Sequence, residues 1–310
     1  MSSLRNRGFT LIEMLLALVI GLVVLSAALS FVATTYRTAG GNEVREEVHR
    51  NARFIGMSLE RDFQTTGVGI TSSPAFGTLG LWNDTIVIIH VPFDSTEAKI
   101  YPLKPTTCTV SPLPAGGTCG ANCVNVDKGV GVFGIKVGDL AQINVNGVRR
   151  LIVVSTVTDM GTSMALQFIT ADSLLHLPAG ITGPPATLLT CPTGTFVQRL
   201  IPILYWRDSQ KRLWRAEALK LDGKPNGVIA AYGVDSLKST LVFLDGTQAT
   251  VVNRNGALPN QTFDNVVGLR VEAVLAAAKA DPRLNLGQLY TRRYLWRFAP
   301  RNLMWQRNQL

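Results

Sequence analysis

The chain has 310 residues, 46% of them hydrophobic, and a formal net charge of +9. This apolar content is ample for a packed core and excludes a chain that is disordered throughout. The length leaves room for a long helix with one large or two small globular units. The positive residues are scattered along the sequence, so the excess charge alone does not predict a nucleic-acid partner.

The N-terminus combines a short basic leader with an apolar segment of membrane length. Residues 1–8 read MSSLRNRG, and the segment from Phe9 to Ala33 follows with Glu13 as its only charge. About 20 apolar residues cross the hydrocarbon core of a bilayer, so this segment is predicted to span one. A secretory signal peptide would be cut after its apolar run, whereas here the cut is predicted before it, after Gly8. The basic leader would stay in the cytoplasm and send the C-terminal part across the membrane.

The residues around this cut resemble the signature of type IV prepilins. The run Gly8-Phe9-Thr10-Leu11-Ile12-Glu13 places a glycine before the cut, an aromatic residue after it and a glutamate four residues further. Glycine presents a peptidase with a backbone that no side chain shields. The resemblance implies that an inner-membrane prepilin peptidase cuts after Gly8 and methylates the new amine of Phe9.

Glu13 is the most informative single residue of this segment. A carboxylate costs about 2.5–3.5 kcal/mol at the bilayer centre, so a functional role is expected. The alternative is a carboxylate near the helix end that reaches the lipid headgroups. The prepilin resemblance implies a partner, the amine of Phe9 on a neighbouring subunit. Phe9 and Glu13 are therefore predicted to act in subunit assembly.

The next segment, 43–63, is predicted to continue the helix as an amphipathic one. Its apolar residues recur at three- and four-residue steps: Val44, Val48, Ala52, Ile55, Leu59 and Phe63. A single helix over 9–65 is expected, on the order of 80 Å long at about 1.5 Å per residue. Gly40-Gly41 is a weak point at which the helix could bend. The stripe is predicted to pack on a globular domain.

Beyond the helix, residues 66–310 show short β-rich runs separated by Gly, Pro, Asn and Asp. The expected strands are Thr85–Val91, Leu140–Val145, Arg150–Val157, Met164–Phe168, Val197–Trp206, Leu213–Leu219, Val242–Leu244, Val266–Val274 and Arg293–Phe298. No second long helix and no internal repeat is indicated. The sequence thus predicts an α+β protein of pilin-like fold, with a β-rich domain that is either single or divided into two lobes near 178–192.

Several later segments resemble the PilW family of minor pilins. Leu59-Glu60-Arg61-Asp62-Phe63 is similar to the helix end of that family, and Leu204-Tyr205-Trp206 with Arg212-Leu213-Trp214-Arg215 to its hairpins. Tyr232-Gly233-Val234-Asp235, the run NVVGLRV from Asn265 and the terminal strand from Arg293 continue in the family's order. The tryptophan-containing extension from Met304 departs from the pattern. So does Ser30, where many major pilins have a proline.

The four cysteines are Cys108, Cys119, Cys123 and Cys191. A periplasmic domain lies in an oxidising compartment, so two disulfides are expected, and three connectivities are possible. The alternative is a zinc site with Cys119 and Cys123 as two ligands and Cys191 with Cys108 or His176 as the others. The spacing of these residues is loose for zinc. We therefore expect disulfides and no cofactor.

No catalytic pattern stands out. The glycines of 129–134 match a dinucleotide fingerprint, but no helix is predicted after them and no acid follows about 20 residues on. The histidines are isolated. The chain is therefore not expected to be an enzyme, although a membrane-tethered periplasmic enzyme and a DNA-capturing pilin remain alternatives.

The resemblance implies a minor pilin of the inner membrane that helps to initiate type IV pilus assembly in a tip complex. It implies as partners other minor pilins, the major pilin, the assembly platform and the prepilin peptidase, with a tip adhesin as a further candidate. The alternative function is that of a minor pseudopilin in a type II secretion system, because leader, anchor and β-domain style are shared.

Overall fold

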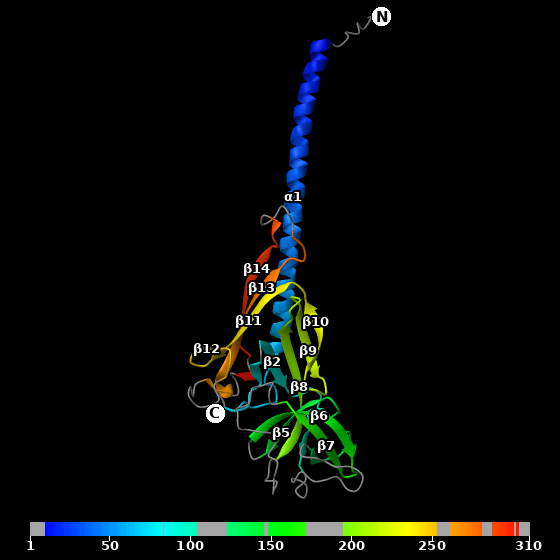
Figure 1. The fold of residues 1–310 in the computed structure, drawn as a ribbon, viewed down its shortest axis with the longest axis vertical. Helices are drawn as coiled ribbons and strands as arrows, with labels where there is room; N and C mark the ends of the chain where they lie inside the picture. The colour runs from blue at the N-terminus through cyan, green and yellow to red at the C-terminus, as the bar shows by residue number, and fades with distance from the viewer. Residues whose placement is uncertain are drawn as a thin grey trace, which may run out of the picture. The chain divides into compact units, whose positions relative to one another are not determined.

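The computed structural model describes residues 10–82, 84–103, 123–145, 148–171, 195–252, 261–280, 287–300 and 302–303. The chain divides into two compact units. One comprises 1–50 and 277–291, and the other comprises 51–276 and 292–310. The first contains the apolar part of a long helix, and the second contains the end of that helix with nearly all of the β structure (Figure 1).

Helix α1 runs without interruption from Leu11 to Gln64 and is 54 residues long. It contains no proline, and it continues as helix through Gly40 and Gly41, the predicted weak point. The apolar stripe of its last turns is buried, because Ala52, Ile55, Leu59 and Phe63 are each no more than 3% exposed. The single long helix and the packing of this stripe agree with the prediction.

The residues that follow the helix, Thr65 to Gly67, explain why it ends there. The hydroxyl of Thr65 donates to the carbonyl of Asp62 at 2.7 Å, which satisfies a carbonyl of the last turn. Gly67 adopts a φ of 72°, a conformation that glycine takes without steric cost. Its N–H donates to the carbonyl of Ile89, so the chain joins a β-sheet directly after the helix.

The larger sheet has ten strands, with the path β1-β2-β8-β5-β6-β7-β4 and the additional strands β3, β9 and β10. Their bounds are β1 Leu79–Trp82, β2 Thr85–His90, β3 Ile100–Pro102, β4 Cys123–Asp127, β5 Leu140–Val145, β6 Val148–Asp159, β7 Ser163–Thr170, β8 Phe196–Arg207, β9 Leu213–Leu219 and β10 Pro225–Ala231. The pairings among these described strands are antiparallel.

Strand β8 organises this sheet because its two halves have different neighbours. Its first half pairs with β3 and β5, and its second half pairs with β2 and β9. One buried cluster includes Val87, Leu140 and Leu204, and another includes Tyr101, Ile143 and Val197. The long strand thus connects two hydrophobic cores.

The smaller sheet has four strands in the order β12-β11-β13-β14. Their bounds are β11 Val234–Phe243, β12 Gln248–Ala249, β13 Val266–Ala276 and β14 Thr291–Phe298, with a short 3-10 helix at Phe263–Asn265 before β13. The ring of Phe298 at the end of β14 stacks on that of Phe63, with centroids 4.8 Å apart. One face of β14 therefore packs on the last turns of α1.

Each predicted strand coincides with part of an observed one, but several strands were missed. The prediction of Val242–Leu244 covers only the end of β11, because Asp235, Ser236 and Lys238 break the apolar alternation earlier in that strand. Strand β10 begins Pro-Asn-Gly, which is typical of a turn. Strands β1, β3, β4 and β12 are at most five residues long, too short for a periodic signal.

Candidate assembly site and helix anchor

The described chain begins next to the predicted processing site. Gly8 and Phe9 lie outside the described residues, whereas Glu13 is in the first turn of α1 and exposed. The backbone N–H and the hydroxyl of Thr10 both donate to Oε2 of Glu13 at 3.3 Å. The N–H of Glu13 in turn donates to the hydroxyl of Thr10 at 3.3 Å.

This reciprocal arrangement is a capping box, in which two unpaired N–H groups at the helix start are satisfied. Its sequence signal is Thr10-x-x-Glu13 before an apolar run. Glu13 consequently has two possible tasks. It caps its own helix, and its charge is available to a partner.

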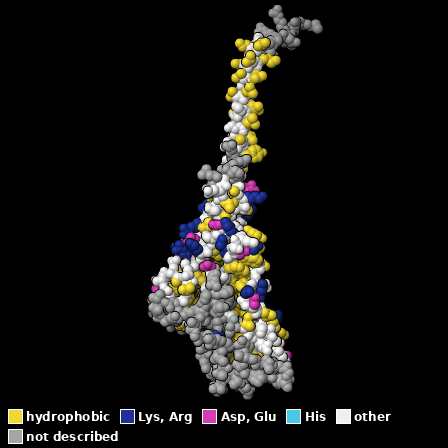
Figure 2. Space-filling view, in the orientation of Figure 1, with side chains coloured by type: hydrophobic (Ala, Val, Ile, Leu, Met, Phe, Trp, Pro, Cys, Tyr) yellow, Lys and Arg dark blue, Asp and Glu magenta, His cyan; other side chains and the backbone are white. Residues whose placement is uncertain are grey.

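The first half of α1 is not covered by any other described part of the chain. Its most apolar 18-residue window has a mean hydropathy of 2.8 and is 0% buried. Leu11 is 82% exposed and Phe31 is 73% exposed. Figure 2 shows hydrophobic side chains along this part of the helix. Among the described residues, α1 is the one helix long and apolar enough to cross a membrane.

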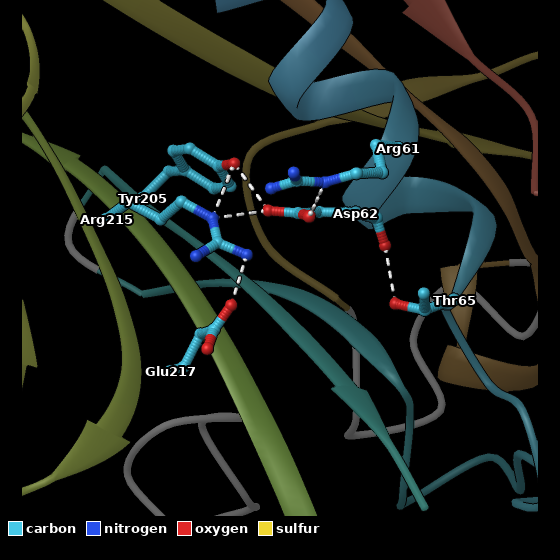
Figure 3. A network of polar contacts seen from close by, with 6 residues as sticks. All are labelled: Arg61, Asp62, Thr65, Tyr205, Arg215 and Glu217. Atoms are coloured by element: carbon cyan, nitrogen blue, oxygen red, sulfur yellow. Dashed lines mark hydrogen bonds and ion pairs between the residues drawn. The ribbon is translucent and has the colours of Figure 1, made fainter. Parts of the chain in front are cut away.

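At its other end, α1 is fixed to the large sheet by a buried carboxylate, Asp62, which is 3% exposed (Figure 3). Its Oδ2 accepts hydrogen bonds from the hydroxyl of Tyr205 at 2.5 Å and from Nε of Arg215 at 2.6 Å. Tyr205 and Arg215 are directly opposite each other on β8 and β9, so they present both donors on one face. Arg61 adds a pair to Oδ1 at 3.1 Å.

The electrostatics of this cluster follow from its geometry. Burial alone would raise the pKa of Asp62, but the hydrogen bonds from Arg215 and Tyr205 outweigh it and hold the pKa below its ordinary value. Burial and the adjacent Asp62 carboxylate raise the pKa of the Tyr205 phenol, which stays protonated as a donor. Arg215 also pairs with Glu217 at 2.6 Å, so both ends of its guanidinium are held.

A cavity of about 530 Å³ lies beside this anchor, between the helix end and the C-terminal segment. Glu60, Phe63, Arg297 and Asn302 are among its lining residues. The side-chain amide of Asn302 donates to the carbonyls of Gln64 and Thr66, each at 3.3 Å. These contacts hold the C-terminal segment against the helix end. The end of α1 is thus fixed by polar contacts at Asp62 and by ring stacking at Phe63.

The structure describes one of the four cysteines. Cys123 begins β4, is 1% exposed and takes part in a disulfide. Cys108, Cys119 and Cys191 lie outside the described residues, as does His176. The connectivity therefore stays a prediction. Within the described ranges, no three His, Cys, Asp or Glu side chains come together as metal ligands.

Comparison with known proteins identifies the N-terminus only. Residues 3–29 match the family model of the prokaryotic N-terminal methylation motif. No curated protein and no solved structure matches the chain. The chain thus carries a prepilin-type methylation motif and is a type IV pilin-like protein, a class processed by prepilin peptidase and associated with pilus assembly machinery.

Proposed function

We propose that this protein is a minor pilin of the PilW type that helps to initiate type IV pilus assembly from a tip complex. The observation that carries the proposal is the prepilin motif at residues 3–29, which continues into an apolar helical segment that no other described residue buries. Such a segment needs lipid or other apolar helices around it. The size of the β-rich part favours a tip position, because so large a domain would crowd a repeating filament lattice.

In the proposed arrangement the protein spans the inner membrane once, and its β-rich part lies in the periplasm before incorporation at the pilus tip. Other minor pilins, the major pilin, the assembly platform and a tip adhesin are the proposed partners. The role is structural, and no catalytic activity is proposed. Glu13 would pair with the amine of Phe9 on a neighbouring subunit, which offsets the cost of its charge among apolar helices.

Variants of the capping box can separate the proposed assembly role of Glu13 from its role in stabilising the helix. Glutamine serves in a capping box as glutamate does, but it carries no charge. Glu13→Gln therefore keeps the cap and removes the charge, Glu13→Ala removes both, and Thr10→Val removes the hydroxyl and keeps the charge. If the charge mediates assembly, Glu13→Gln and Glu13→Ala will both fail, and Thr10→Val will remain active.

The experiment is complementation of a deletion strain, with surface pili counted and leader cleavage followed by immunoblot. We expect normal cleavage in all three variants and loss of pili in the two Glu13 variants. Full piliation by Glu13→Gln would show that the cap, and not the charge, is what matters. A deletion strain with normal pili but defective protein secretion would replace the proposal by the alternative, a minor pseudopilin of a type II secretion system.

A further inference from the structure

The outward face of the smaller sheet gathers cations that are far apart in the sequence. Lys238 of β11 is directly opposite Glu272 of β13, and Thr240 is opposite Arg270, so Lys238 and Arg270 are on one face. Arg293 of β14 reaches the same face, because its Nη2 contacts Oε2 of Glu272 at 2.5 Å. We call Lys238, Arg270, Arg293 and Arg297 the basic sheet face.

Arg297 belongs to this face on two grounds. It is two pleats from Arg293 on the same strand, and side chains four residues apart on a strand point the same way. It also lines, together with Arg270 and Gln248, a cavity of about 250 Å³. Figure 2 shows Lys and Arg side chains gathered over the region of these strands. Glu272, which pairs with Arg293, offsets one of the four positive charges, and Arg297 also lines the larger cavity that contains Glu60.

The chemistry of this face fits a polyanion better than a lipid surface or an apolar partner. Three of its four cations are arginines, whose planar guanidinium binds phosphate oxygens in a bidentate manner. An interfacial membrane site needs a continuous apolar surface beside its cations. Here Leu295, 46% exposed, is the large apolar side chain that β14 exposes between Arg293 and Arg297.

The aromatic residues of β14 decide between duplex and single-stranded nucleic acid. Tyr294 and Trp296 alternate with the arginines along the strand and therefore point to the opposite face. There Trp296 packs against α1 so closely that a Cβ added at Gly56 would lie 2.7 Å from the Nε1 atom of Trp296. They are not placed to stack on bases, which is the main source of affinity for single strands. The face offers charge alone.

We propose that the basic sheet face binds the phosphate backbone of double-stranded DNA without sequence preference. Arg293 and Arg297 are ~13 Å apart along the strand, with Arg270 on the adjacent strand ~5 Å away. A duplex carries about one charge per 1.7 Å of axis, so each of these cations has a phosphate within reach. The proposal revises the expectation drawn from scattered charges and is independent of the proposed assembly role.

The test is binding of a fluorescent 20-base-pair duplex of random sequence to the full chain in a neutral detergent, over a salt series. If the face neutralises about 3–4 phosphates, log K should fall with log salt at a slope of about −2.7 to −3.6, which is roughly a 100-fold loss of affinity between 50 and 200 mM salt. Arg270→Gln with Arg297→Gln should reduce the slope by about 2. If that double variant folds poorly, the second double variant, Lys238→Gln with Arg293→Gln, changes more exposed positions and should reduce the slope by the same amount.

The matched control is Lys220→Gln with Lys224→Gln, which removes the same two charges from the exposed turn between β9 and β10 and should leave binding unchanged. Equal losses in the control and in the sheet variants would overturn the proposal. So would tighter binding of a single strand of equal length. Equal affinity for polyglutamate or for phosphatidylglycerol vesicles would assign the face to an acidic protein or to lipid instead.

Discussion

The buried carboxylate at the end of α1 allows a quantitative prediction. Asp62→Asn keeps the shape of the side chain but leaves the guanidinium of Arg215, whose side chain is 17% exposed, without its buried counter-ion. Removing one partner of a buried ion pair destabilises by about 3–5 kcal/mol, and the partial exposure of Arg215 places the expectation at the lower end. For a β-rich unit of this size, about 3 kcal/mol corresponds to a fall in Tm of about 6–12 °C.

The neighbouring residues provide graded controls. Tyr205→Phe removes one hydrogen bond and leaves the Asp62–Arg215 pair, so we expect a loss of about 1–3 kcal/mol. Arg61→Gln removes a pair whose arginine side chain is 69% exposed, and exposed pairs contribute about 0–1 kcal/mol. The assay is thermal and denaturant unfolding of the full chain in a mild detergent, followed by tryptophan fluorescence.

The pH dependence follows from the lowered pKa of Asp62. A carboxylate whose native pKa is below its unfolded value contributes fully above the unfolded pKa of about 3.9 and loses that contribution as the pH falls through the native pKa. The deficit of Asp62→Asn should therefore be constant between pH 8 and about pH 5 and shrink in more acidic solution. A variant within about 1 kcal/mol of the wild type across the neutral range would refute the reasoning.

Three further predictions concern processing, the cysteines and helix packing. Mass spectrometry of the mature protein should find Phe9 at the N-terminus with an added methyl group, and a start at Met1 or a cut near Ala33 would contradict the prepilin assignment. Thiol labelling without reductant should find none of the four cysteines free in the mature protein, whereas bound zinc with thiols that react after chelation would favour the metal site. Gly56→Leu should destabilise the β-rich unit by about 1–3 kcal/mol, because the leucine side chain would collide with Trp296. The control is Gly21→Ala, whose added Cβ meets no described heavy atom within 4 Å, and it should leave the unfolding of that unit unchanged.

The long helix could be predicted because its signals are local. Leader, apolar run and amphipathic stripe are each readable within a few turns, and the structure has the expected long helix, observed from Leu11 to Gln64. Strands with continuous apolar runs, such as β2 and β8, were found for the same reason. Short strands and polar ones such as β11 were missed because pairing with neighbours, and not their own pattern, makes them strands.

The anchor at Asp62 was partly visible in the sequence. Asp62 follows Ile55 and Leu59 at i+7 and i+3, which places an acid on the apolar face of the helix and signals a buried carboxylate that needs a partner. Its partners could not be named, because Tyr205 and Arg215 are more than a hundred residues away and meet Asp62 only through the pairing of β8 with β9. The basic sheet face is hidden in the same way, since Lys238, Arg270 and Arg297 belong to three different strands.

The two carboxylates near the ends of α1 are satisfied differently, and the difference bears on assembly. Asp62 is buried and receives hydrogen bonds from two strands, so its charge is compensated within the chain. Glu13 is exposed, and in the described part of the chain its hydrogen bonds are with Thr10, the neutral residue just before the helix. A cap accounts for the geometry of Glu13 but not for its charge, because glutamine would cap equally well and would cost less in an apolar helix. Under the proposed function the charge of Glu13 pairs with a neighbouring subunit, and the comparison of Glu13→Gln with Thr10→Val tests that pairing directly.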